Sequence, residues 1–146
     1  MENIKELIKE NELDLTTLIV FTRAEHEIHK REFRTIKQTG LTPAQFGVLE
    51  ALYNKGDLRV GELIEKVLTT SGNITVVIKN LEKDGLIKRM QDPEDRRSFL
   101  ISLTDAGKKI IEDMFPDHIE NIKSIFQVLT DDEKNTLKSI LKKFRT

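Results

Sequence analysis

The chain contains no cysteine and no tryptophan among its 146 residues, and only 5% of them are aromatic. The absence of cysteine excludes a disulfide framework, a thiol redox sensor and any cysteine-ligated metal site. A low aromatic content argues against a stacking platform for single-stranded nucleic acid, which needs aromatic faces. The sequence also lacks an apolar run of the roughly 18–20 residues that cross a bilayer, and its acidic start has no signal-peptide core. We therefore expect a cytoplasmic protein.

The sequence shows no nucleophile–base arrangement, glycine-rich phosphate loop or paired-carboxylate motif, so we expect no enzymatic activity and no cofactor. Charged residues make up 34% of the chain and hydrophobic residues 38%, which is typical of one domain rich in long helices. The formal net charge is −1. Total charge therefore does not favour a nucleic-acid partner, and such a function must depend on where the basic residues lie.

Apolar periodicity predicts four helices in the first 84 residues. A long helix is expected over residues 7–38. The second begins at the capping box Thr42-Pro43-Ala44-Gln45 and ends near Gly56. Two shorter helices follow, over residues 60–68 and 71–84. The last two, joined by a short turn, have the order of a helix-turn-helix.

The second half of the chain begins with a predicted hairpin, with strands over residues 86–91 and 98–103. A final helical region starts at Thr104 and is expected to kink or restart at Pro116, because proline lacks the helical N–H donor. A second capping box, Thr130–Glu133, opens the C-terminal helix. The sequence thus predicts a mainly α protein with a small β-hairpin wing.

The helix predicted over residues 71–84 has an apolar face and a polar face. Its N-terminal end, which enters the major groove in a helix-turn-helix, carries Ser71, Asn73 and Thr75. Thr70 lies directly before this helix, and Lys79 lies one turn further on. Amide and hydroxyl groups can read base edges, and Lys79 is placed for a phosphate or a guanine. These could also be ordinary solvated residues, but the hairpin that follows favours DNA binding.

The loop of the predicted hairpin, Asp92-Pro93-Glu94-Asp95-Arg96-Arg97, places two adjacent guanidinium groups at its tip. Asp95 lies two residues before Arg97, where a carboxylate can hold a guanidinium by paired hydrogen bonds. An arginine fixed in this way suits a narrow minor groove, and Arg96 would then face a phosphate. The alternative is a surface ion pair, which commonly contributes little stability.

Three segments resemble the MarR (multiple antibiotic resistance regulator) family of bacterial winged-helix transcription factors. They read LTPAQFGVLEAL, VGELIEKVLTTSGNITVVIKNLEKDGLIKR and DPEDRRSFLISLTDAG, and the resemblance covers roughly residues 41–111. It implies a single domain over residues 1–146, with a winged helix-turn-helix core over residues 41–111. Residues 1–40 and 112–146 would supply dimerisation helices. The resemblance further implies a homodimer that grips a pseudo-palindromic operator in double-stranded promoter DNA as a repressor.

By position, Ser71, Asn73, Thr75 and Lys79 match the base- and backbone-facing sites of that family, and Arg97 matches its wing arginine, oriented by Asp95. Many members have an arginine directly after the recognition-helix threonine, where this chain has Val76. Because the contact of that arginine with DNA is missing here, the resemblance does not predict the operator sequence. The segment EKVLTTSGNIT is similar to the sequences of a branch of this family whose members respond to organic hydroperoxides or quinone-like phenolics. Without cysteine, the resemblance implies a phenolic or quinone-like effector.

The resemblance also implies an effector pocket between the DNA-reading unit and the dimer helices. Five aromatic residues could line this pocket or simply belong to the core: Phe21, Phe33, Phe46, Tyr53 and Phe115.

Two histidines, His26 and His29, have a helical spacing that suits a divalent metal, but a complete site would need carboxylates or another chain. We expect no metal site. Two alternatives to a promoter-binding repressor remain open: a winged-helix protein–protein adaptor without DNA affinity, and a metal-responsive regulator.

Overall fold

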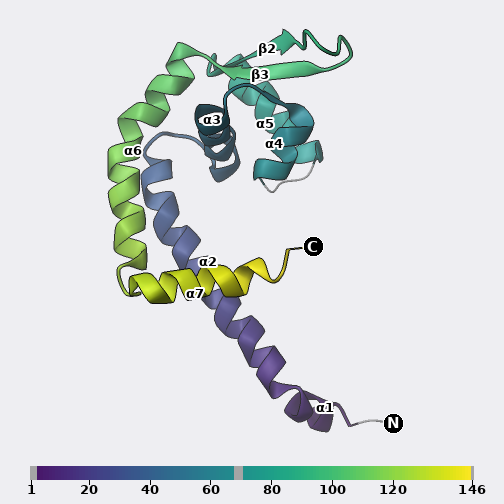
Figure 1. Cartoon of the computed structure of the whole chain (residues 1–146), viewed down its shortest axis with the longest axis vertical. Coiled ribbons are helices and arrows are strands. Elements are labelled where there is room, and N and C mark those ends of the chain that lie inside the picture. Colours follow the sequence, from purple (N-terminus) through teal and green to yellow (C-terminus); the bar gives the residue numbers. More distant parts are fainter. Residues whose placement is uncertain (1–2, 68–70, 146) are drawn as a thin grey trace.

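The computed structural model describes residues 3–67 and 71–145, with the side chains of residues 71 and 72 excluded. The elements follow in the order α1 (Ile4–Glu10), α2 (Glu12–Lys37), α3 (Pro43–Lys55), β1 (Leu58–Arg59), α4 (Val60–Val67), α5 (Ser71–Lys83), β2 (Ile87–Gln91), β3 (Phe99–Leu103), α6 (Asp105–Phe126) and α7 (Asp131–Lys142). Helices α2 and α6 lie side by side, with α3, α4, α5 and the sheet at one end and α1 and α7 towards the other (Figure 1). Among the described helices, none combines the length and apolar character needed to cross a bilayer.

Helices α3, α4 and α5 and the three strands, which we call the winged unit, enclose the main hydrophobic core. Strand β3 lies between β1 and β2 and is antiparallel to both, with Leu58 opposite Ile101 and Ile87 opposite Leu103. The apolar face predicted for α5 is confirmed, because its apolar residues at helical spacing are all buried: Ile74, Val77, Ile78 and Leu81. The sheet and α5 therefore form one packed body.

Hydrogen bonds at the helix starts confirm both predicted capping boxes. In α3, the Thr42 hydroxyl accepts from the Gln45 amide at 3.1 Å, and the Gln45 side chain accepts from the Thr42 amide at 3.0 Å. The corresponding pair at the start of α7 is Thr130 and Glu133. Each box satisfies two backbone donors that a helix N-terminus leaves open, which explains why both boundaries fall where the sequence places them.

Helix α6 is attached closely to the loop between α5 and β2. The Thr104 hydroxyl donates to the carbonyl oxygen of Gly85 at 2.7 Å and accepts from the Gly107 amide at 3.2 Å. A Cβ atom at Gly107 would lie 2.2 Å from the carbonyl oxygen of Leu86, so only glycine allows this approach. The winged unit is therefore held to the N-terminal turn of α6 by backbone contact.

The long N-terminal helix expected over residues 7–38 is divided in the structure. Helix α1 ends at Glu10, and α2 begins at Glu12 after Asn11, whose backbone angles are φ −111° and ψ 20°. The Asn11 side chain donates to the carbonyl oxygen of Leu7 at 2.8 Å. Asparagine side chains compete in this way with the helical backbone pattern, a local effect that the apolar periodicity does not reveal.

Of the two outcomes expected at Pro116, a kink or a restart of the helix, the restart does not occur. Helix α6 continues through Pro116 as one element from Asp105 to Phe126. Pro116 lies on the exposed side of α6. The carbonyl group that loses its partner there can bind water instead, which lowers the cost of a proline inside a helix.

Helices α2 and α6 are joined by buried polar contacts. The Asn121 amide nitrogen donates to the carbonyl oxygen of Arg31 at 2.8 Å, and its amide oxygen accepts from the Arg34 guanidinium at 2.7 Å. The Thr35 hydroxyl lies 2.7 Å from Nδ1 of His118, which is 1% exposed. Such satisfied buried polar groups fix the register of two packed helices.

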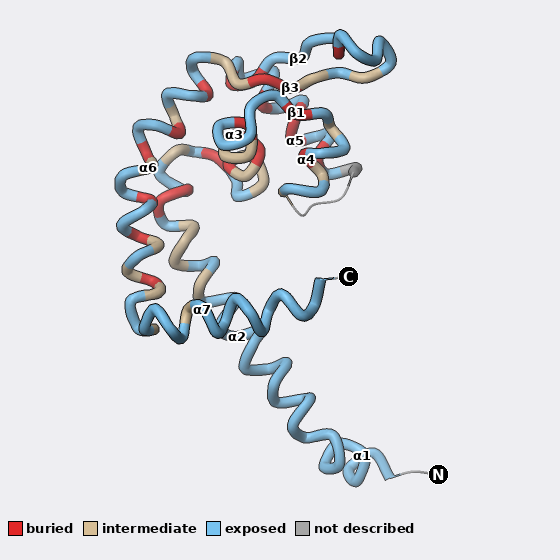
Figure 2. Tube along the Cα trace, in the orientation of Figure 1, coloured by how far each residue is buried: buried red, intermediate tan, exposed pale blue. Residues whose placement is uncertain are grey.

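Burial divides the molecule into two parts. Buried residues occur in the winged unit and in the adjoining parts of α2 and α6, whereas α1, the first part of α2 and nearly all of α7 are exposed (Figure 2). Helices α1 and α7 contain no buried residue.

Candidate nucleic-acid interface

Helix α5 presents one polar face to solvent. Asn73, Thr75 and Lys79 are exposed, together with Val76, while the opposite face is buried in the core. This is the division predicted from the sequence. Thr70 lies outside the described residues, and the described part of Ser71 is limited to its backbone at the start of α5. The exposed residues begin at the N-terminal end of α5, where a recognition helix contacts base edges.

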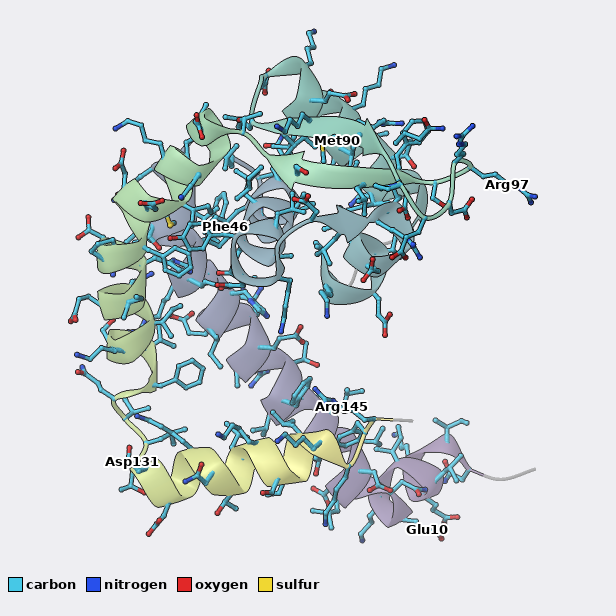
Figure 3. All side chains as sticks on the ribbon, turned by 45° about the horizontal axis from the view of Figure 1, so that its top comes forward. Glu10, Phe46, Met90, Arg97, Asp131 and Arg145 are labelled. Carbon is cyan, nitrogen blue, oxygen red and sulfur yellow. The ribbon has the colours of Figure 1, made fainter. Side chains whose placement is uncertain are left out.

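The wing is the hairpin of β2 and β3 with its loop, and it extends away from the helices (Figure 1). Its end is closed by a hydrogen bond from the Asp92 amide to the carbonyl oxygen of Ser98 at 3.0 Å. Arg96 and Arg97 are both exposed, and the Arg97 side chain points outward from the tip (Figure 3). Among the described residues, neither arginine forms an ion pair. Two guanidinium groups are thus available to an anionic ligand.

The contact expected between Asp95 and the Arg97 guanidinium is not formed in this structure. The Asp95 carboxylate accepts instead from the backbone amide of Arg97 at 3.0 Å and from the Ser98 hydroxyl at 3.3 Å. A short acidic side chain readily bonds the backbone two residues on, and this local bond competes with the ion pair. Asp95 therefore shapes the loop and leaves the Arg97 guanidinium unrestrained.

The base of the wing contains a contact that the sequence did not suggest. Arg59, on β1, donates from Nε to Oδ2 of Asp92 at 2.7 Å, and its Nη2 lies 2.6 Å from the same oxygen. The other carboxylate oxygen of Asp92 accepts from the Glu94 amide at 2.9 Å. These bonds from the Glu94 amide and then from Arg59 hold the pKa of the buried Asp92 carboxyl below its usual value. Asp92-Pro93 signalled a turn, but no pattern connected it to a residue 33 positions earlier.

A second cation links the wing to the recognition helix. The Arg89 guanidinium lies over the ring of Phe99 at 5.3 Å from its centroid and 3.7 Å from the Glu82 carboxylate on α5. Arg89 and Phe99 are diagonal to each other on β2 and β3, where Arg89 lies opposite Ile101 and Phe99 opposite Gln91. The basic residues near the wing therefore differ in role, since Arg59 and Arg89 contact protein carboxylates, whereas Arg96 and Arg97 form no ion pair with any residue that the structure describes.

Comparison with known proteins identifies the chain. The family model for MarR matches residues 41–99. The HTH-type transcriptional regulator MhqR of Bacillus subtilis is 36% identical over 132 residues, which cover 90% of this chain and 91% of that protein. The chain belongs to the MarR family. It is a DNA-binding transcriptional regulator of the helix-turn-helix type.

Two further MarR-family comparisons agree with this assignment. The uncharacterized HTH-type transcriptional regulator YkoM of Bacillus subtilis is 38% identical over 124 residues, covering 85% of this chain and 80% of the relative. The crystal structure of a mutant MarR from E. coli, complexed with operator DNA, superposes with a TM-score of 0.81. It is 26% identical and covers 93% of this chain and 97% of that chain. The predicted winged-helix fold is confirmed.

Three of the five aromatic residues expected at an effector pocket in this MarR-family chain lie at the contact of α3 with α6. The rings of Phe46 and Phe115 meet His118 edge to face at 5.1 and 5.9 Å, and Tyr53 stacks on Phe115 at 6.3 Å. Phe33 packs against the core, whereas Phe21 lies exposed on the first part of α2, away from this cluster.

A hollow of about 680 Å³ lies between α2, α3 and α4, and the aromatic cluster does not line it. Glu32 and Glu50 both line this hollow. Burial and, secondarily, Glu32 raise the pKa of the Glu50 carboxyl above its ordinary value.

The histidine pair on α2 forms no metal centre among the described residues of this MarR-family chain. His29 lies 3.0 Å from the Glu32 carboxylate and 4.0 Å from that of Glu25. Within the described ranges, no group of three or more histidine, aspartate or glutamate side chains could hold a metal ion. His118, the third histidine, is instead buried between aromatic rings, where desolvation lowers its pKa.

Proposed function

We propose that this MarR-family regulator is a homodimeric repressor that reads a pseudo-palindromic operator in double-stranded promoter DNA. The recognition end of α5, with Ser71, Asn73, Thr75 and Lys79, faces the major groove, while Arg97 enters the minor groove and Arg96 contacts phosphate. Thr70 is assigned to the same surface by its sequence position. The observation that carries this proposal is the exposed polar face of α5 beside two wing arginines that have no ion-pair partner within the described residues.

A dimer is supported by the two ends of the chain, which we call the arms: residues 4–21 and residues 131–144. An isolated chain would leave many large apolar side chains of the arms in water, a pattern that marks a protein–protein contact. They are Ile4, Leu7, Ile8, Leu13, Leu15, Leu18, Ile19, Val20, Phe21, Leu137, Ile140, Leu141 and Phe144. A second copy of the chain would cover them and place two winged units on half-sites about 34–36 Å apart, one turn of DNA.

DNA binding by the proposed surface can be tested by gel shift with a duplex selected by the full-length protein from a random-sequence library. Because lysine and arginine release counterions from phosphate, affinity should fall steeply as salt concentration rises. Arg97→Ala should weaken binding by about tenfold while leaving the melting temperature unchanged, since the side chain is exposed. Salt-independent or absent binding would favour the protein–protein adaptor, and full affinity of Arg97→Ala would remove the wing arginine from the interface.

We further propose that a phenolic or quinone-like effector releases the repressor. Tyr53, stacked on Phe115 and partly exposed, offers an aromatic face, and Phe46 belongs to the same cluster through His118. Phe33 and Phe21 are assigned to the pocket by the sequence resemblance alone. Catechol or benzoquinone should then weaken the gel shift, and Tyr53→Ala should remove that response without changing operator affinity. An unaltered gel shift with both compounds would contradict this effector class.

The regulator is proposed to act in the cytoplasm, where a promoter-binding protein meets its DNA, and to need neither an enzymatic activity nor a metal. Zinc titration by calorimetry distinguishes it from a metal-responsive regulator. Heat of binding with a defined stoichiometry, together with a zinc-dependent gel shift, would favour the metal-responsive alternative.

A further inference from the structure

We propose that Arg59 and Asp92 form a clamp that orients the wing for DNA binding, although neither side chain contacts DNA. The proposal rests on the DNA-binding wing proposed above and assigns positioning roles to two residues outside the interface. The pair fixes the direction in which the tip arginines leave the sheet.

The topology of the sheet explains why such a clamp is needed. Among the described strands, β1 pairs with β3, through Leu58 and Arg59, and is separated from β2 by β3 in the strand order β1-β3-β2. Asp92 directly follows β2, and its amide bonds the carbonyl oxygen of Ser98 at 3.0 Å. The Arg59 side chain therefore connects one edge strand to the end of the other, across β3. Bending of the hairpin against the helices would break this connection.

The chemistry of the contact suits a rigid joint. Asp92 is 3% exposed, and one of its oxygens receives both Nε and Nη2 of Arg59 at 2.7 and 2.6 Å. Its other oxygen receives the Glu94 amide at 2.9 Å, which fixes the first turn of the loop. Charge-assisted bonds with two donors from one guanidinium restrict direction as well as distance. A lysine has the charge of Arg59 but not this planar pair of donors.

The clamp also connects the wing with the helix-turn-helix. Arg59 is the last residue of β1, directly before α4, and its amide donates to the Glu62 carboxylate in the first turn of α4 at 3.1 Å. One residue thus joins the loop that carries Arg96 and Arg97 to the helix that precedes the recognition helix. Arg96 and Arg97 lie four and five residues beyond Asp92, so a small rotation at Asp92 displaces both guanidinium groups.

The decisive experiment uses a substitution for which electrostatics and loss of the clamp change the affinity for DNA in opposite directions. Asp92→Asn removes a negative charge near the wing, and charge alone would then strengthen binding to DNA. Loss of the clamp instead predicts weaker binding. The expected loss of affinity is about tenfold, which lies in the middle of the range of interaction energies between residues in contact. Affinity is measured by fluorescence anisotropy on the full-length dimer, with the selected duplex as probe and thermal unfolding followed by circular dichroism.

Glu94→Gln is the matched control, because it removes the same charge two residues away. Its carboxylate is 88% exposed and reaches Arg59 only at 3.8 Å. It should bind the duplex as tightly as the wild type or more tightly. Arg59→Gln should weaken binding to the same extent as Asp92→Asn, and the double variant should be no weaker than either single one. This non-additivity is the sign of a shared contact.

A combination with Arg97→Ala separates positioning from general destabilisation. If the clamp acts through the wing, Arg97→Ala should cost less affinity in the Asp92→Asn background than in the wild type. Arg59→Lys provides a second route should Asp92→Asn unfold, and it should also weaken binding. Asp92→Asn binding as tightly as Glu94→Gln, or full affinity of Arg59→Lys, would overturn the clamp. Wild-type protein that does not bind, or Arg97→Ala with full affinity, would instead overturn the proposed function of the wing.

Discussion

The winged unit and the arms both contain amphipathic helices, but they differ in whether their apolar side chains are buried within the chain. In the winged unit the apolar faces of α3, α4 and α5 meet one another and the sheet, so a single chain completes the core. In the arms, α1 and α7 bury nothing within the chain. An amphipathic helix gains most of its stability from packing of its apolar face. The core of the winged unit is therefore completed within one chain, whereas the arms leave apolar faces that the proposed dimer would cover with a second chain.

The largest expected effect comes from a charge in the arms. Leu18→Asp places a carboxylate at a 62% exposed apolar position, where the proposed dimer would bury it at high cost. The protein should become monomeric by light scattering and lose operator affinity by about 100-fold or more, because two linked half-site contacts become one.

Val128→Asp is the control for this prediction, since Val128 is 78% exposed but lies in the turn between α6 and α7, outside the arms. It should remain dimeric and bind normally. If Leu18→Asp also remained dimeric, the arms would not be the dimer interface, and the contrast between the two regions would need another explanation.

Local sequence signals predicted the parts of the fold that depend on neighbours in the chain. The capping boxes of α3 and α7 and the buried face of α5 all follow from residues within one or two turns of one another. Two of the contacts that the sequence did not reveal join residues far apart, Arg59 with Asp92 and Thr35 with His118, which are 33 and 83 positions apart. Tertiary packing determines which of these residues contact each other, and neither apolar periodicity nor helix-capping motifs predict it.

The wing tip shows the same limit at short range. The exposure of Arg96 and Arg97 could be predicted from their place in a turn, and the structure agrees. The partner of the Asp95 carboxylate could not, because two competing donors, the amide and the guanidinium of Arg97, belong to the same residue. The conformation of the folded loop determines that the Arg97 amide, rather than its guanidinium, donates to the Asp95 carboxylate.

A second, smaller effect should appear where α6 contacts the winged unit and not in the arms. Gly107→Ala places a Cβ atom 2.2 Å from the carbonyl oxygen of Leu86, a backbone atom that cannot move away independently. The free energy of unfolding should fall by about 1–3 kcal/mol, as for other overpacked sites. Chemical denaturation followed by circular dichroism measures this change.

Gly61→Ala is the matched control, because no atom of the described residues lies within 4 Å of the added atom and the site is helical. It should be neutral or stabilising by up to roughly 1 kcal/mol. Equal stability of the two alanine variants would show that α6 is not held to the Leu86 backbone as closely as described.

The smallest effect concerns the joint between the two regions, where α2, α3 and α6 meet at His118. Burial between the rings of Phe46 and Phe115 lowers the pKa of His118, with Glu32 opposing the shift. Between about pH 6.5 and the lowered pKa of His118 in the folded chain, the unfolded chain therefore takes up a proton that the folded chain does not. The free energy of unfolding should decrease as pH falls through this window, by at most about 1.4 kcal/mol per pH unit.

His118→Asn tests this joint, because an amide can bond the Thr35 hydroxyl but does not titrate. The variant should be less stable at neutral pH and should lose part of the pH dependence between about pH 6.5 and the lowered pKa of His118. Glu50 contributes to the pH dependence of the free energy of unfolding with the opposite sign. Its pKa is raised, so the folded chain binds its proton first as pH falls. The difference between wild type and variant removes that contribution. An unchanged slope would mean that His118 is accessible to protons in the folded chain, and the joint would then be open to solvent.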